Sequence, residues 1–98
     1  MTHADIDRRI ARLVRRCIEK IDAHPERLHD TVGPSIERIG DPAVRAEWRL
    51  LLQRPWAELR ALLLEESERA ARLRQNAPFG RLLTPRERME VFRESQAA

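Results

Sequence analysis

Apolar residues recur every three or four positions through most of the chain, which is the spacing of one face of an α-helix. Only a few prolines and glycines interrupt the pattern, and valine and isoleucine rarely alternate with polar residues as they would in a strand. The pattern predicts an all-α fold: a small bundle of four to five helices over about residues 4–23, 25–39, 42–53, 55–75 and 85–94.

The first predicted helix has the most regular pattern. Thr2 and Asp5 have the spacing of a capping box, in which each side chain accepts a hydrogen bond from the other residue's backbone N–H. The inner row of its apolar face has the 4-3-4 spacing of a coiled-coil seam. We expect this seam to pack inside the bundle or against a second copy of the chain, as a candidate interface. The seam residues are Ile10, Val14, Cys17 and Ile21.

Prolines mark the boundaries of the middle helices. Pro25 begins the second predicted helix, which Gly33-Pro34 should kink or interrupt. Asp41-Pro42 supplies an N-cap and a first-turn proline for the third helix. Pro55 separates the third helix from the fourth, but Arg54 before it is a poor N-cap. The sequence therefore favours a break at Pro55 only slightly over one helix kinked there.

The fourth predicted helix, residues 55–75, is rich in leucine. Trp48 and Trp56 are eight residues apart, and we expect both to anchor one core across the proline. Glu66 is the exception, because it projects near the middle of the apolar face. Either water or an arginine of this chain meets its carboxylate there, or Glu66 belongs to an interface whose partner supplies the arginine.

The last predicted helix begins at Thr84-Pro85, which supplies an N-cap and a first-turn proline, and residues 95–98 should fray. We expect residues 1–98 to form a single helical domain, since 98 residues suffice for one core. Cys17 is the only cysteine, so a reducing cytoplasm is the expected location. We expect no secretion signal and no membrane association, because no apolar run approaches the ~20 residues that span a bilayer.

The chemistry-bearing residues are too scattered to predict a catalytic or metal centre. The histidines and Cys17 lack metal-ligand spacing, and the three glycines are isolated, so no phosphate-binding loop is present. Cys17 lies on the seam, where a cysteine is usually a small buried apolar residue. We therefore expect no enzyme activity, no cofactor, no metal and no small-molecule substrate.

Arginine dominates the basic residues: Lys20 is the only lysine, so 18 of the 19 basic residues are arginine, and the net charge is +3. Five arginines occupy the face of the first helix opposite its seam. Such a face is usually hydrated or paired with acids of another helix, but it can also contact the phosphates of a nucleic acid. These candidate phosphate contacts are Arg8, Arg9, Arg12, Arg15 and Arg16.

Two functions follow from these patterns. The first is a small cytoplasmic interaction or regulatory module that binds a protein partner or a second copy of itself, because the supply of apolar residues is generous for 98 residues. The alternative is a nucleic-acid-binding regulator that uses the arginine-rich face. The near balance of acidic and basic residues makes it the weaker hypothesis.

Overall fold

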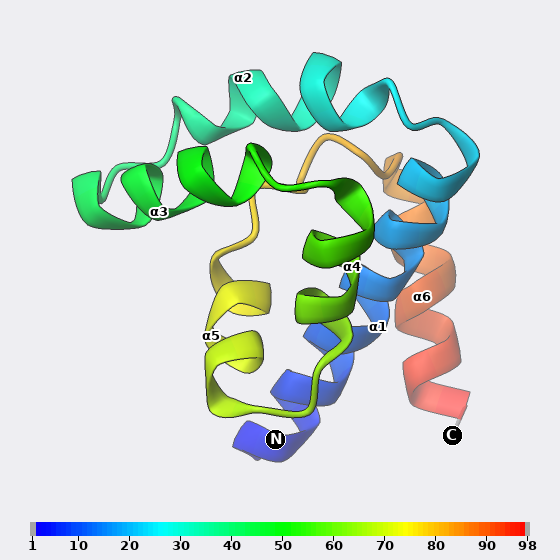
Figure 1. The fold of residues 1–98 in the computed structure, drawn as a ribbon. Helices are drawn as coiled ribbons and strands as arrows, with labels where there is room; N and C mark the ends of the chain where they lie inside the picture. The colour runs from blue at the N-terminus through cyan, green and yellow to red at the C-terminus, as the bar shows by residue number, and fades with distance from the viewer. Residues whose placement is uncertain (1, 98) are drawn as a thin grey trace.

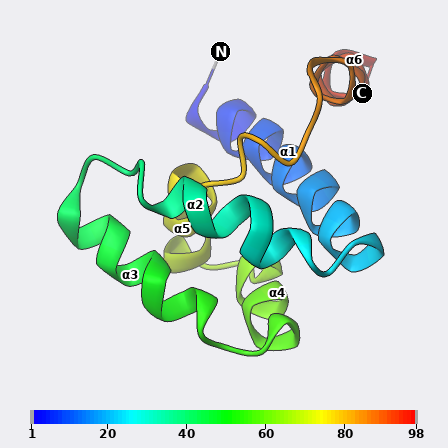
Figure 2. The ribbon, with the colours of Figure 1, turned by 90° about the horizontal axis from the view of Figure 1, so that it is seen from above.

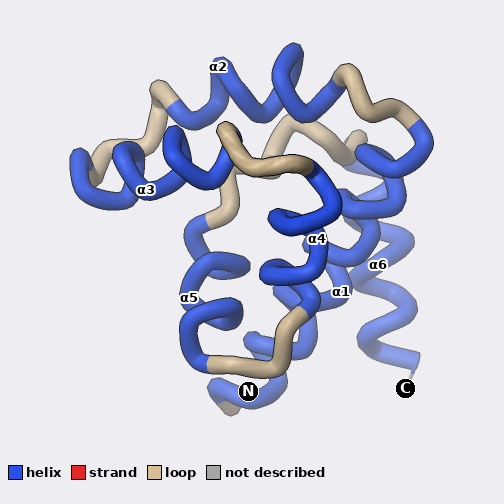
Figure 3. Tube along the Cα trace, in the orientation of Figure 1, coloured by secondary structure: helices blue, strands red, loops and turns tan. Residues whose placement is uncertain are grey.

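The computed structural model describes residues 2–97, apart from the side chains of residues 95 and 97, and this part of the chain contains helices and no strand (Figures 1 and 3). The all-α prediction is confirmed, although six α-helices are present where four to five were predicted. They are α1 (His3–Ala23), α2 (Gly33–Ile36), α3 (Pro42–Leu52), α4 (Trp56–Leu64), α5 (Glu68–Asn76) and α6 (Pro85–Ala97), with a π-helical turn, η1 (Leu28–Val32), before α2.

Helix α1 is the element on which much of the bundle packs, since it contacts α4, α5 and α6. Its start agrees with the sequence: the Thr2 hydroxyl accepts a hydrogen bond from the Asp5 N–H, and the Asp5 carboxylate accepts one from the Thr2 N–H. The buried side of α1 faces a core that also contains Trp48, which is fully buried and meets Phe79 edge to face at 5.7 Å between ring centroids.

The segment predicted as a helix over 25–39 is shorter than expected and changes its hydrogen-bond register at Gly33-Pro34. In η1 the Gly33 N–H donates to the Leu28 carbonyl five residues back, which is the π-helical pattern. Pro34 has no N–H to continue that ladder, so α2 restarts as an ordinary α-helix. Helices α2 and α3 then run antiparallel to each other along one end of the molecule (Figures 1 and 2).

The break at Pro55 is present: α3 ends at Leu52 and α4 begins at Trp56. The two tryptophans have different roles on either side of it. Trp48 is a core residue as predicted, and Trp56 is partly buried and packs against the same core. The Trp56 indole N–H donates to Asp22 at 2.8 Å, and the Arg60 guanidinium also bonds Asp22, so α4 is tied to the end of α1.

The prediction of one helix over 55–75 is wrong, because the chain breaks again between α4 and α5. Glu65 is extended, and the Ser67 hydroxyl caps α5 by accepting from the Ala70 N–H at 3.1 Å. The Arg74 guanidinium reaches back to the carbonyls of Leu63 and Glu65, at 2.8 and 3.0 Å. These contacts hold α5 antiparallel beside α4 (Figure 1).

Helix α6 lies beside α1 at the edge of the bundle, where Figure 2 views it end-on. The Thr84 hydroxyl and the Glu87 carboxylate form the capping box at its start. The helix continues to Ala97, three residues beyond its predicted end, so fraying of residues 95–98 stays a prediction, and residue 98 lies outside the described residues. Within residues 2–97, no helix has the length and apolar character needed to cross a membrane.

Candidate functional site

The seam of α1 faces the protein's own core. Val14, Cys17 and Ile21 are buried, and Ile10 is partly buried at the edge of the same cluster. The thiol of Cys17 lies 4.0 Å from the Phe79 carbonyl oxygen, and its burial raises its pKa to about 12. Of the two arrangements expected for the seam, packing inside the bundle is the one the structure has. These side chains are not available to a second copy.

Glu66 lies in the exposed connection between α4 and α5 rather than on the apolar face of a helix. Its expected position depended on a continuous helix over 55–75, which the Ser67 cap interrupts. Its carboxylate is exposed to solvent and has no hydrogen-bond or ion-pair partner within the described part of the chain. The sequence reason for placing Glu66 in an interface is therefore removed.

Three of the five candidate arginines of α1 are already engaged. The Arg8 guanidinium bonds Asp5 at 2.6 Å, and the Arg9 guanidinium stacks over the Phe92 ring at 4.3 Å. Arg16 contacts acids on both its own helix and α6, with its guanidinium 3.4 Å from Glu19 and 3.5 Å from Glu87.

Arg12 and Arg15 are exposed, and neither makes a hydrogen bond or an ion pair within residues 2–97. They line a groove of about 380 Å³ between α1 and α6, together with Arg16. Three carboxylates share that groove, which reduces its positive potential. The three acids are Glu19, Glu90 and Glu94.

Lys20 and Glu87 form the closest ion pair between α1 and α6, with the ammonium 2.7 Å from the carboxylate. This bond, together with the hydrogen bond from the Thr84 N–H, lowers the pKa of Glu87 to about 2. Glu87 therefore has two roles: it caps α6, and it binds α6 to α1. Part of the basic face of α1 therefore forms ion pairs with α6.

An exposed apolar surface, which we call the α1/α6 patch, lies across these two helices and consists of Ile6, Arg9, Met89 and Phe92. Met89 is 52% exposed and Phe92 is 37% exposed. They are three residues apart and therefore neighbours on α6. Ile6 is likewise three residues from Arg9, whose guanidinium covers Phe92. The patch is the apolar surface that the α1–α6 pair leaves in water.

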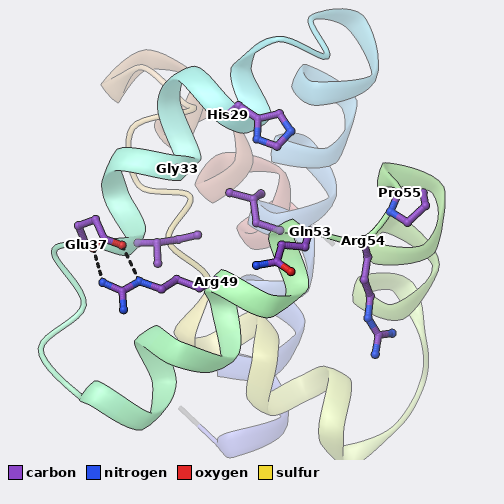
Figure 4. A pocket seen from close by; sticks show the side chains of 9 residues that line it. His29, Gly33, Glu37, Arg49, Gln53, Arg54 and Pro55 are labelled. Carbon is purple, nitrogen blue, oxygen red and sulfur yellow. Dashed lines mark hydrogen bonds and ion pairs between the residues drawn. The ribbon is translucent and has the colours of Figure 1, made fainter.

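A second feature is the α2–α3 cleft, a hollow of about 660 Å³ between the antiparallel helices α2 and α3 (Figure 4). Ile36 and Leu52 supply apolar side chains, and Gly33 contributes no side chain. Polar and charged residues line the rest of the cleft, and the turn at Pro55 closes one end. The lining residues are His29, Gly33, Ile36, Glu37, Arg49, Leu52, Gln53, Arg54 and Pro55.

One ion pair crosses the α2–α3 cleft. The Arg49 guanidinium bonds both oxygens of the Glu37 carboxylate, with the Nε–Oε2 distance at 2.9 Å, and lowers the pKa of Glu37 (Figure 4). His29, Gln53 and Arg54 make no such bond within residues 2–97. In Figure 4 the Arg54 side chain extends outward from the turn before Pro55. Glu37, the one acid of the lining, is thus paired with Arg49, while the donors of His29, Gln53 and Arg54 have no partner within residues 2–97.

The sequence did not predict this cleft, because its lining residues come from two separate stretches of the chain, 29–37 and 49–55. No group of three or more His, Cys, Asp or Glu side chains placed to hold a metal ion occurs in the part of the chain that the structure describes. No protein-family model, curated protein or solved structure significantly matches this chain.

Proposed function

We propose that the protein is a non-catalytic helical interaction module that acts in the cytoplasm as a homodimer, with the α1/α6 patch at the centre of its interface. The observation that carries the proposal is the exposure of Met89 and Phe92 on a helix packed chiefly against α1. Neighbouring large apolar side chains left in water favour association, because burying them removes apolar surface from solvent.

The shape of the patch supports a second copy as the partner. Helices α1 and α6 lie side by side, and α6 is at the edge of the bundle, so no other helix obstructs an approach to its outer side (Figure 2). A twofold dimer uses the same patch on both subunits, and each copy then covers the other's Met89 and Phe92. Cys17 is buried and too far inside to cross-link the subunits, so the association is non-covalent.

Sedimentation equilibrium of the full chain between about 10 µM and 1 mM tests the proposal. We expect a monomer–dimer equilibrium that Met89→Lys weakens more than tenfold, because the ammonium must be desolvated in the interface. Leu50→Lys is the matched control, since it places the same charge at an exposed apolar position on α3. A monomer over the whole range, or equal effects of the two variants, contradicts a dimer through this patch.

Nucleic-acid binding is the second candidate, favoured by the exposure of Arg12 and Arg15. Two phosphate contacts predict that the logarithm of the binding constant for duplex DNA falls with the logarithm of salt concentration with a slope of about −2. The double variant Arg12→Ala, Arg15→Ala should remove that slope. Glu90 and Glu94 in the same groove weigh against this candidate.

A further inference from the structure

The α2–α3 cleft has the form of a groove between two antiparallel helices, into which a third helix can place side chains. Gly33 leaves space in the groove, since a Cβ built there would come within 4 Å of Leu52 Cδ2 alone, at 3.9 Å, apart from its chain neighbours and its own helix backbone. Leu52, which is partly buried, offers an apolar contact beside that opening, whereas Ile36 beneath it is fully buried. Grooves of this kind accept the apolar face of an amphipathic helix, with one or two large side chains as anchors.

Exposed apolar surface continues out of the cleft along α3. Leu50 is 66% exposed, the highest value among the large apolar side chains of the described residues. It is three residues before Gln53, which lines the cleft, so the two are neighbours on α3. Ala46 is also exposed, one helical turn before Leu50. A helix seated in the cleft and leaning on α3 would cover this surface.

The charges of the cleft favour an acidic ligand. Arg49 occupies the one lining carboxylate, that of Glu37, through both of its oxygens. The remaining polar groups at the other end are the His29 imidazole, the Gln53 amide and the Arg54 guanidinium. Arg54 is exposed on the turn before Pro55, and its side chain, which extends outward in Figure 4, has no bond within the described chain that holds it there. A carboxylate at that end would meet donors and no competing acid of the lining.

The π-helical turn η1 is a second, independent feature of the α2–α3 cleft. A π-helical turn is rare and occurs often at functional sites, because its wider backbone displaces side chains from the α-helical register. Here the turn carries His29, and its last hydrogen bond comes from Gly33, so both residues of that wall of the cleft depend on it.

The open rim favours a peptide over a small molecule. His29, Glu37, Arg49, Gln53 and Arg54 are all exposed. A small molecule needs most of its surface buried to bind well, which an open cleft does not provide. A helix gains affinity from contact along its length, including contact with Leu50.

We infer that the α2–α3 cleft binds a short amphipathic helix of a partner protein, which inserts a large apolar side chain beside Gly33 and presents a carboxylate to Arg54 and His29. The apolar face of the same helix covers Leu50. This site is separate from the α1/α6 patch, and binding of the peptide there does not depend on the homodimer.

Selection from a display library of random peptides about twelve residues long, against the immobilised full chain, supplies the probes. We expect the enriched peptides to combine large apolar residues at helical spacing with Asp or Glu. Fluorescence anisotropy should show that Gly33→Met, which fills the groove on a helical backbone, weakens binding more than tenfold. Leu50→Lys should have a similar effect.

Charge specificity has its own matched test. Arg54→Glu should weaken an acidic peptide about tenfold and leave its Glu-to-Gln counterpart nearly unchanged. Arg81→Glu is the control, since Arg81 is an exposed arginine outside the cleft. Equal effects of the two charge reversals, or peptides that are indifferent to Gly33→Met, would overturn the inference. Displacement of the peptide by millimolar benzoate would also overturn it, because the site would then be one for small carboxylates.

The monomeric variant of the α1/α6 patch separates the two proposals. Met89→Lys should bind the selected peptides as well as the unaltered chain does, even though its dimerisation is weakened. If Leu50→Lys instead dissociates the dimer, the cleft side of α3 is the dimer interface, and both the α1/α6 assignment and the heterologous peptide site are wrong.

Discussion

Arg74→Met tests the break between α4 and α5, which is the main difference between the predicted and the observed fold. The substitution keeps an apolar stem of similar length but removes the guanidinium that bonds the Leu63 and Glu65 carbonyls. A hydrogen bond from a charged donor contributes about 1.5–3 kcal/mol when it is protected from water. The bond to Leu63 is partly buried and the bond to Glu65 is exposed, so we expect a total loss of about 2 kcal/mol.

Equilibrium unfolding in urea, followed by tryptophan fluorescence, measures this loss because Trp48 is fully buried in the native state. For a domain of this size a loss of about 2 kcal/mol also lowers the melting temperature by roughly 8–16 °C. Arg69→Met on the same helix is the control, since Arg69 is exposed and makes no hydrogen bond or ion pair in the described chain, although its charge acts on Glu47. We expect it to change the free energy of unfolding by less than about 0.5 kcal/mol. If Arg74→Met were equally mild, the guanidinium would not hold the break.

Three further outcomes follow from local geometry. Gly33→Ala should lower the urea midpoint of unfolding, because Gly33 is α-helical directly before Pro34, where the proline ring crowds a Cβ, although the new Cβ meets Leu52 at an ordinary 3.9 Å; a rise in the midpoint would contradict this. The hydrogen bonds from Lys20 and from the Thr84 N–H lower the pKa of Glu87 from 4.5 to about 2, so the stabilisation by the ionised carboxylate is complete above pH 4.5 and is lost as the pH falls through 2. Urea midpoints between pH 5 and 2 should accordingly fall less steeply in Glu87→Gln than in the unaltered chain, and identical slopes would exclude this role. The raised pKa of buried Cys17 predicts that a disulfide reagent at pH 8 labels it only as fast as the protein opens, a rate that urea should increase; immediate labelling of the native protein would show that the thiol is accessible.

The boundaries that the sequence predicted well are those where side chains cap their own helix. The Thr2–Asp5 box and the Asp41 cap lie within three residues of the groups that they bond, so spacing alone identifies them. The break before Ser67 was missed because the apolar spacing continues through it. The reversal there depends on Arg74, which contacts Leu63 only after the chain has turned back, and a local pattern does not reveal such a contact.

Candidate surfaces were harder to predict than helices, for a related reason. Periodicity identified the seam of α1 as apolar, but it could not say which helices of the same chain would cover Cys17 and Ile21. It also could not place Glu87 of α6 against Arg16 and Lys20, which turned part of the basic face into an intramolecular contact. The α2–α3 cleft depends on tertiary packing throughout, and in the sequence only Gly33 and Leu50 give any indication of it.

The position of α1 has a consequence for how the chain is made. Helix α1 is synthesised before the helices that cover its apolar side, because α4, α5 and α6 lie beyond residue 55. At ~5–20 residues per second, the ribosome needs roughly 4–14 s to proceed from Ile21 to Val91. Throughout that interval the nascent chain carries an amphipathic segment without its native cover. A chaperone that protects this segment would therefore be most useful before release, and a truncation before α4 should yield an aggregating fragment rather than a smaller folded protein.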